Sequence, residues 1–436
     1  MKYKLKGKRV LVYGMGISGQ SASKLLHQKG ACVSIYDDEA RFSNVYSYEK
    51  EPLTKKYDLV VLSPGIKMRG NAIISHFILS KVPIISELDL GSSFCKGNII
   101  AITGTNGKTT VTSLVGDIFK KAGKNTFVCG NIGLPISSIS EKTDRKSFVV
   151  CEVSNFQLEG SKSFSADEAC ILNLMPDHID RHDSFEEYIR VKKKIFTRKK
   201  QKRVLNYDDP VSRALGIYKN VTFFSKAPLV KGVYVKNNAI YHNKKRIISL
   251  NDIPLFGDKN LENVLASVAL AVGYKIKSNV IRSAVISFKA PPHRLECLGE
   301  VEGAMVFDDS KATNISATLS AINSLGEKGL VILLGGLNKG FEFDEIFNRG
   351  YNFEQILCFG QAGEEIYNCA VKYGYSPLLF EDMKSATLYA KNHAQPQQKI
   401  LLAPACASFD EFSSYSVRGE VFKEIMFEKI EKIELS

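Results

Sequence analysis

Apolar and polar positions along the first ninety residues alternate in the order expected of strands separated by helices. Residues 18–29 have the three-to-four-residue apolar spacing of an amphipathic helix. Short apolar runs typical of strands occur at 8–13, 31–36, 58–63 and 83–85. Strands separated by helices form parallel sheets, which bind ligands beyond the strands' carboxyl ends. The pattern predicts an α/β domain at residues 1–92.

A second α/β pattern begins near residue 95 and predicts a domain at residues 93–295. Its strand-like runs lie at 98–103, 146–153 and 169–174, and its helices are expected at 111–122 and 257–272. Residues 199–251 are richer in strand-forming residues, with asparagine turn signals at 237–238 and 243–244.

A third α/β pattern predicts a domain at residues 296–436. Strand-like runs separated by helical segments occur at 304–307, 330–334, 355–359, 376–380 and 399–403. The length of 436 residues is also too great for one ordinary core and suits about three domains.

The composition excludes several classes of protein. Hydrophobic residues make up 44% and charged residues 24%, as in folded globular proteins. The longest apolar runs fall well short of the roughly 18 residues that a membrane span needs, and no apolar signal core follows the basic start. We expect a soluble, cytoplasmic protein that does not insert into a membrane.

The chain is basic, since 59 Lys and Arg against 46 Asp and Glu give a net charge of +13. Clusters at 192–194 and 198–203 are compatible with nucleic acid, but without a basic tail a general surface bias fits better. Nine cysteines without a C-x-x-C spacing predict reduced thiols rather than disulfides or zinc sites. Those expected to be buried are Cys32, Cys129, Cys151, Cys170 and Cys358.

The clearest chemical signal is a glycine loop between the strand at 98–103 and the helix that follows it. Residues 103–109 read Thr-Gly-Thr-Asn-Gly-Lys-Thr. Backbone N–H groups in such a loop and the helix N-terminus bind phosphates, a lysine neutralises the outer phosphates, and a threonine hydroxyl ligates Mg²⁺. We therefore predict ATP binding by Gly104, Thr105, Asn106, Gly107, Lys108, Thr109 and Thr110.

Two further residues follow strands of the same predicted sheet. Glu152 ends the run at 146–153, and His178 lies just past the run at 169–174. Singly, each has an ordinary explanation as a helix cap or a loop residue. Their shared place at strand carboxyl ends favours metal ligands beside the phosphates.

The first domain also has a glycine loop, Gly14-Met15-Gly16-Ile17-Ser18-Gly19, directly after a strand. Taken alone, this pattern is typical of a dinucleotide site, and an NAD-dependent oxidoreductase is one alternative. A nucleic-acid motor with a phosphate loop is another.

With these motifs in place, the sequence resembles the Mur ligases, the ATP-dependent amide-forming enzymes of peptidoglycan synthesis. The motifs lie in order at residues 103–109, 152–158, 177–182, 260–263 and 293–294. Similarity to the D-glutamate-adding members rests on residues 14–19, 63–66, 309–314 and 405–410. A sister ligase that adds another amino acid stays an alternative.

The resemblance implies a three-domain α/β fold: an N-terminal Rossmann-like domain, a central P-loop mononucleotide-binding sheet and a C-terminal Rossmann-like domain. It implies a two-step reaction in which ATP phosphorylates the carboxylate of UDP-N-acetylmuramoyl-L-alanine and the amine of D-glutamate attacks the acyl phosphate. A monomer that binds small-molecule substrates and no nucleic acid is expected.

The resemblance also assigns site residues. Catalytic roles fall to Lys108, His178, Lys192 and Lys311. Two Mg²⁺ ions are expected on Thr109, Glu152, His178 and Lys192, the last as a carbamate formed with CO₂; Lys193 is the alternative for that lysine. Further ATP contacts are Asn263, Arg294 and Asp309. The UDP-sugar falls to Ile17, Ser18, Asp37, Gly65 and Asn131, and the amino acid to Thr313, Lys339, Ser408 and Tyr415.

Several positions depart from the family pattern. Lys259 stands where a histidine is common, and the loop at 335–340 has Leu337 and Asn338 where an acidic residue is usual. Tyr415 stands where a phenylalanine can occur. These departures concern contacts to the nucleotide base and to glutamate.

Overall fold

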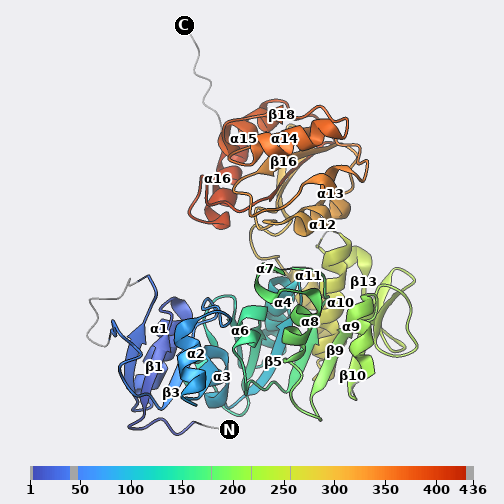
Figure 1. Ribbon diagram of the computed structural model, residues 1–436. Coiled ribbons are helices and arrows are strands. Elements are labelled where there is room, and N and C mark those ends of the chain that lie inside the picture. The colour runs from blue at the N-terminus through green and yellow to red at the C-terminus, as the bar shows by residue number, and fades with distance from the viewer. Residues whose placement is uncertain (1–2, 40–47, 178, 218, 256, 429–436) are drawn as a thin grey trace. The chain divides into compact units, whose positions relative to one another are not determined.

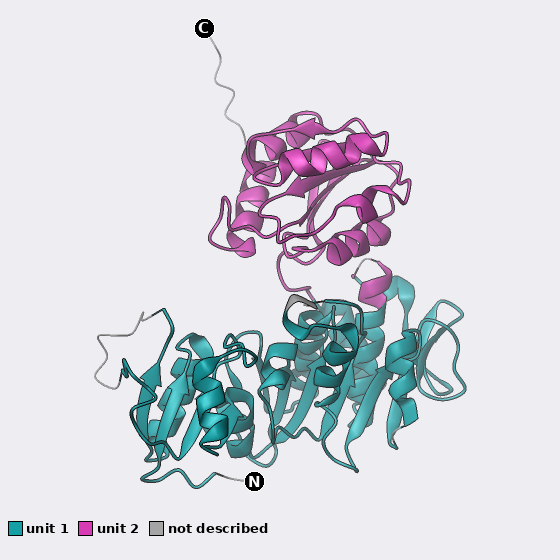
Figure 2. Ribbon diagram, viewed as in Figure 1, with its two compact units in different colours: residues 1–254, 262–288 teal, residues 255–261, 289–436 magenta. Residues whose placement is uncertain are grey.

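The computed structural model describes residues 3–39, 48–177, 179–217, 219–255 and 257–428. The chain divides into two compact units (Figure 2): residues 1–254 with 262–288, and residues 255–261 with 289–436. The first unit contains two sheets and the second contains one. The α/β class and its three sheets are confirmed, whereas the boundaries at residues 92 and 295 stay predictions.

The first sheet has four parallel strands in the order β2-β1-β3-β4 (Figure 1). Its strands are β1 (Arg9–Tyr13), β2 (Cys32–Tyr36), β3 (Leu59–Leu62) and β4 (Ile84–Ser86). Its helices are α1 (Ile17–Gln28), α2 (Ala72–Leu79) and α3 (Glu87–Phe94). Helices α1 and α3 contribute to the core on one face and α2 to the core on the other. This explains the uninterrupted apolar run of β1, because both faces of that strand are covered.

The sequence pattern did not predict α3, because its first turn is polar. Ser86 and Asp89 form a capping box at its N-terminus. Glu87 is fully buried and accepts hydrogen bonds from the backbone N–H and hydroxyl of Ser137. The polar residues thus begin the helix and join it to the neighbouring domain.

The second sheet has nine described strands in the order β13-β12-β11-β10-β9-β8-β5-β7-β6. They are β5 (Asn98–Thr103), β6 (Thr126–Gly130), β7 (Phe148–Glu152), β8 (Glu168–Ile171), β9 (Lys202–Asn206), β10 (Val221–Ser225), β11 (Val233–Lys236), β12 (Ala239–His242) and β13 (Lys245–Ser249). The pairs from β6 to β11 are parallel, and β11-β12-β13 are antiparallel. The predicted asparagine turns are confirmed, because Asn237, Asn238 and Asn243 all adopt the positive φ that tight hairpins require.

The helices that accompany this sheet are α4 (Lys108–Lys121), α5 (Ile136–Ile139), α6 (Asn155–Glu159), α7 (Ile179–His182), α8 (Phe185–Lys193), α9 (Pro210–Ala214), α10 (Asp258–Gly273) and α11 (Ser278–Ser287). Helix α4 begins three residues earlier than the predicted 111–122. The early start matters because it places Lys108 and Thr109 in the first turn, next to the glycine loop.

The third sheet has the order β14-β15-β19-β16-β17-β18. Its strands are β14 (Glu296–Val301), β15 (Ala304–Asp308), β16 (Leu330–Gly335), β17 (Gln355–Phe359), β18 (Leu378–Leu379) and β19 (Lys399–Ala405). Its helices are α12 (Ile315–Leu325), α13 (Asp344–Phe347), α14 (Gly363–Lys372), α15 (Met383–Asn392) and α16 (Tyr415–Phe427). Only β14 pairs antiparallel among these strands, and the sequence pattern missed it because this edge strand is only half-buried.

One buried arginine connects three loops of the third sheet. Arg418 in α16 is fully buried and donates to the Ser310 hydroxyl and to the backbone carbonyls of Ser310, Cys406 and Ala407. Ala407 also pairs with Leu337 through two backbone hydrogen bonds. The loops that follow β15, β16 and β19 are therefore held as one assembly.

All nine cysteines are free, and four of the five named above are buried. The prediction for Cys32 is wrong, because this residue begins the edge strand β2 and is exposed. Among the described residues, none of the helices combines the length and the apolar character that a bilayer crossing requires.

Glu168 is a buried carboxyl group in the middle of the second sheet. It is 2% exposed, and its Oε2 atom has no hydrogen-bond partner. Burial raises the pKa of Glu168 to about 8, although the charge of Lys202 opposes the rise. The folded chain therefore holds a proton on Glu168 that the unfolded chain releases at lower pH.

We expect Glu168 to make the stability of the first unit depend on pH. Because its pKa is higher in the folded state, the free energy of unfolding falls as pH rises from about 4.5 to about 8 and then levels off. Glu168→Gln, which cannot ionise, removes this fall and stabilises the protein at high pH by up to about 5 kcal/mol. Urea unfolding from about pH 5 to about pH 9 measures the difference. The exposed Glu186→Gln is the matched control, and parallel pH profiles for Glu168→Gln and wild type would contradict the assignment.

Candidate active site

The glycine loop between β5 and α4 has the backbone geometry of an anion cradle. Gly107 has a φ of 84° and precedes α4, whose N-terminus has no side-chain cap. A Cβ atom at Gly107 would lie 2.1 Å from Oδ1 of Asn263, so any other residue would be strained at this φ and would displace the Asn263 side chain. A helix N-terminus without a side-chain cap suits a ligand with acceptor oxygens, such as a phosphate.

Two side chains of the first turn of α4 complete the cradle. The Lys108 ammonium donates to the carbonyls of Gly104 and Thr105, at 2.9 and 2.7 Å. The Thr109 hydroxyl donates to Oε2 of Glu152, at 2.8 Å. Hydroxyl and carboxylate oxygens are the donors that Mg²⁺ prefers, so this pair fits a magnesium ion beside a phosphate chain.

Residues that the sequence prediction did not single out hold the loop in shape. Asn173, after β8, accepts from the Asn106 backbone N–H at 2.9 Å and donates back to its carbonyl at 3.2 Å. The hydroxyls of Thr105 and Tyr188 lie 3.0 Å apart. Since Asn173 follows an apolar strand, its position could have indicated a role at the loop.

Lys192 of α8 points into the same place and is fully buried. Its ammonium lies 2.9 Å from the Gly104 carbonyl and 3.3 Å from the Thr103 hydroxyl. Burial and the nearby positive charge of Lys108 hold the pKa of Lys192 well below its ordinary value, while Asp177 and Glu152 oppose the shift. Lys193 is exposed, so the two candidates from the lysine run differ sharply in environment.

Glu152 connects the glycine loop to a second site. This carboxylate is 1% exposed, and its Oε1 accepts from the Asn131 amide at 2.9 Å while Oε2 accepts from Thr109. The Asn131 backbone N–H also bonds to the Glu152 carbonyl. Asn131 also lines a pocket, so Glu152 bonds both to the helix after the glycine loop and to a pocket residue.

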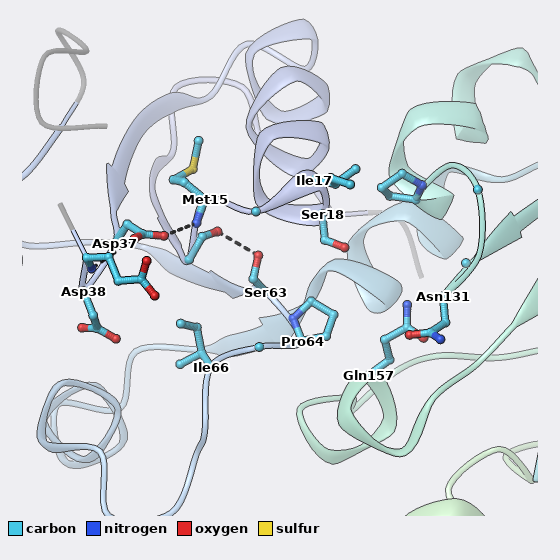
Figure 3. Close-up of a pocket in the computed structure, with 17 residues that line it drawn as sticks. Met15, Ile17, Ser18, Asp37, Asp38, Ser63, Pro64, Ile66, Asn131 and Gln157 are labelled. Atoms are coloured by element: carbon cyan, nitrogen blue, oxygen red, sulfur yellow. Dashed lines mark hydrogen bonds between the residues drawn. The ribbon is translucent and has the colours of Figure 1, made fainter. Parts of the chain in front are cut away.

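That pocket has a volume of about 540 Å³ and brings together every residue predicted to bind the UDP-sugar. These are Ile17, Ser18, Asp37, Gly65 and Asn131. Figure 3 shows Asn131 and Gln157 on the wall formed by the central domain, across from the loops of the first sheet. Asp38, Ser63, Pro64, Ile66 and Gln157 also line the pocket and were not predicted as contacts.

The first-sheet wall of the pocket contains a glycine loop that is followed by an uncapped helix. Gly14 has a φ of 90°, and a Cβ there would lie 2.8 Å from the Ser63 side chain. Helix α1 has no side-chain cap at its N-terminus. Asp37 accepts from the Met15 backbone N–H at 2.7 Å, and Ser63 donates to the Gly14 carbonyl at 2.8 Å. These bonds hold the glycine loop beside the pocket, next to the uncapped N-terminus of α1, which suits a ligand with acceptor oxygens.

In the second unit, the predicted residues gather at the carboxyl ends of neighbouring strands. Asp309, Lys311 and Thr313 follow β15, Lys339 follows β16, and Ser408 and Tyr415 follow β19. Lys311 lies 3.9 Å from the centre of the Tyr415 ring. Lys339 lies 5.8 Å from the Phe409 ring, another aromatic residue that the prediction did not include.

Arg294 and Asp309 lie close together within the same unit. Burial raises the pKa of Asp309 to about 7, and the positive charge of Arg294 opposes the rise. His293 Nδ1 donates to Oδ2 of Asp308 over 2.6 Å, which holds the segment before β14 against the end of β15. The opposite charges of Arg294 and Asp309 lie near each other, in keeping with the prediction that both contact ATP.

The structure leaves two parts of the prediction open. His178 lies outside the described residues, so its place beside Glu152 stays a prediction. Lys108 and Asn263 belong to the first unit, whereas Arg294, Asp309 and Lys311 belong to the second. Their joint action on one nucleotide also stays a prediction.

Comparison with known proteins finds family models that match two long segments of the chain. Residues 102–271 match the family model of the Mur ligase middle domain, and residues 293–406 match that of the Mur ligase glutamate ligase domain. The UDP-N-acetylmuramoylalanine--D-glutamate ligase of Caldanaerobacter subterraneus is 36% identical over 447 residues, which cover 97% of this chain and 99% of the relative. That of Thermoanaerobacter sp. is 37% identical over 455 residues, with the same coverage.

Solved structures agree on the fold. A pseudomurein peptide ligase type C from Methanothermus fervidus aligns with a TM-score of 0.61 at 19% identity, over 96% of this chain and 100% of that one. The UDP-N-acetylmuramate-alanine ligase of Thermotoga maritima aligns with a TM-score of 0.60 at 18% identity, over 96% and 98%. The motifs, the three sheets and the full-length relatives together show that this chain belongs to the Mur ligase family.

Proposed function

We propose that this chain joins D-glutamate to the carboxyl group of UDP-N-acetylmuramoyl-L-alanine with the breakdown of ATP to ADP and phosphate. The observation that carries the proposal is the position of Glu152, bonded to Thr109 of the glycine loop and to Asn131 of the sugar-nucleotide pocket. A phosphate donor and a UDP-linked acceptor bound at these two places would meet at one carboxylate. The full-length relatives carry the name of this activity.

In the first step, a carboxylate oxygen of the UDP-sugar attacks the γ-phosphorus of ATP, the bond to the β-phosphate oxygen breaks, and ADP leaves. Lys108 and the N–H groups at the start of α4 offset the negative charge that two anions bring together. Arg294, Asp309 and Lys311 would reach the nucleotide from the second unit, with Lys311 near the transferred phosphate.

In the second step, the amine of D-glutamate attacks the acyl phosphate, loses a proton, and phosphate leaves from the tetrahedral intermediate. Thr313, Lys339, Ser408 and Tyr415 would bind the two glutamate carboxylates. Their common location at the carboxyl edge of the third sheet supports this role, because three of these residues offer hydroxyls and Lys339 offers a cation at the same edge.

Thr109 and Glu152 would hold one Mg²⁺, with His178 and a carbamylated Lys192 completing the sites for two ions. Bound magnesium supplies charge neutralisation at the transferring phosphate. A buried lysine with a lowered pKa loses its proton more readily, and the resulting neutral amine can add to CO₂, forming an N–C bond and releasing a proton. The product is an anionic oxygen ligand, and burial favours Lys192 over the exposed Lys193.

We expect the enzyme to act in the cytoplasm, where its nucleotide substrates occur. We also expect it to be a monomer and to need no nucleic acid. Binding of small anionic substrates would account for the basic charge of the chain without DNA or RNA.

The proposed reaction predicts a specific pattern of phosphate release. With ATP, Mg²⁺ and UDP-N-acetylmuramoyl-L-alanine present, D-glutamate should start steady release, whereas L-glutamate, L-alanine and L-lysine should not. A phosphate-release assay with mass detection of the amide tests this. Equal activity with L-lysine or L-alanine would point to a sister ligase, and stimulation by DNA or RNA instead of the UDP-sugar would point to a motor.

Replacement of the loop lysine tests the nucleotide site. Lys108→Ala should lower kcat by at least about a hundredfold, because the cation that faces the phosphates is lost. Lys120→Ala removes an exposed lysine from the last turn of the same helix and serves as the control. Activity within about twofold of wild type in Lys108→Ala would remove this lysine from the mechanism.

Replacement of the buried lysine tests the carbamate. Lys192→Ala should lower kcat by about a hundredfold, and formate or acetate should restore part of it by replacing the missing carboxylate oxygens. Lys193→Ala, an exposed neighbour, should behave as wild type. Mass spectrometry of the intact protein in bicarbonate would detect the added CO₂; loss of activity without any rescue by carboxylates would argue for a role as an amine instead.

A further inference from the structure

Arg181 of α7 makes contacts that the proposed mechanism does not use. Its Nε donates to Oε2 of Glu159 at 2.7 Å, and its Nη2 donates to the carbonyls of Pro64 at 3.3 Å and Ile66 at 3.1 Å. The guanidinium carbon lies 4.3 Å from the centre of the Phe156 ring. The side chains of Arg181 and Glu159 are only 12% and 13% exposed, so water screens this ion pair weakly.

The two carbonyls belong to the loop that forms one wall of the sugar-nucleotide pocket. Pro64, Gly65 and Ile66 all line that pocket. On its other side the loop is held by Ser63, which donates to the Gly14 carbonyl. These bonds restrict the Pro64–Gly65 and Ile66–Lys67 peptide planes, which lie on either side of the Gly65–Ile66 peptide.

The remaining contacts of Arg181 lead to the opposite wall. Glu159 ends α6, and Gln157 of the same helix lines the pocket. Next to Arg181, the His182 ring lies 2.8 Å from the Asn155 amide at the start of α6. Arg181 and His182 thus both connect α7 to α6, and Arg181 also contacts the loop that follows β3 of the first sheet.

An arginine suits this position for a geometric reason. Its planar group donates in separate directions to three acceptors on two segments and still stacks on an aromatic ring, which an ammonium group cannot do. The neighbouring cations have other partners: Lys194 bonds to the Glu159 carbonyl, and Arg190 pairs with Glu187.

We propose that Arg181 is a positioning residue for the sugar-nucleotide substrate, because it fixes the Pro64–Gly65–Ile66 wall against the wall that carries Gln157. The inference rests on the proposed function, since it takes a UDP-sugar as the occupant of the pocket. Arg181 touches neither the glycine loop nor Lys108 in the contacts described, so nucleotide affinity should not depend on it.

The test separates affinity for the two substrates. Arg181→Ala should raise KM for UDP-N-acetylmuramoyl-L-alanine, and its Kd from calorimetry, by roughly tenfold or more, while KM for ATP stays within about twofold. Arg181→Lys should remain impaired, whereas added methylguanidinium should restore the affinity of Arg181→Ala and methylammonium should not. Arg190→Ala, an exposed arginine on α8, is the matched control and should bind as wild type.

Circular dichroism checks the folding of each variant. If Arg181→Ala does not fold, Glu159→Gln serves as the second variant, because it keeps the acceptor but loses the charge, and it should raise the same KM by a smaller factor. An unchanged Kd for the UDP-sugar, or equal rises in both KM values, would overturn the role of Arg181. Wild-type protein that neither binds the UDP-sugar nor releases phosphate would instead overturn the proposed function.

Discussion

A single buried carboxylate at the end of a parallel strand determines how the first unit can work. Glu152 has one oxygen toward Thr109 and the other toward Asn131, and almost no exposure to water. A buried carboxylate with only neutral hydrogen-bond donors is costly unless a cation joins it. The pair of oxygens therefore suits a divalent ion, in keeping with the proposed magnesium site between the glycine loop and the pocket.

The parts of the site that follow simple rules could be predicted from sequence. Strands that are separated by helices end at a common edge, so the residues after the runs at 98–103 and 146–153 had to lie together. A glycine loop followed by Lys108 and Thr109 leaves little choice of chemistry. The residues predicted to bind the UDP-sugar also line one pocket, although family resemblance rather than spacing indicated them; they are Ile17, Ser18, Asp37, Gly65 and Asn131.

The parts that sequence could not provide depend on long-range pairing. Arg181 and Arg418 read as ordinary charged helix residues, because nothing near them in sequence shows the carbonyls that they bind. Glu87 and Ser86 read as a loop because their partners lie in another segment or are backbone groups. Choosing between Lys192 and Lys193 required knowing which face of α8 is buried. Three consecutive lysines do not show this.

The buried Arg418 limits how the loops of the third sheet can change in length during evolution. Because Arg418 bonds to the carbonyls of Ser310, Cys406 and Ala407, inserting a residue into either loop would shift acceptors that a fully buried cation requires. Changes in amino-acid preference among relatives should therefore arise by exchanging side chains on loops of constant length. The backbone of these loops would stay the same among relatives, and amino-acid selectivity would change through the side chains that the loops carry.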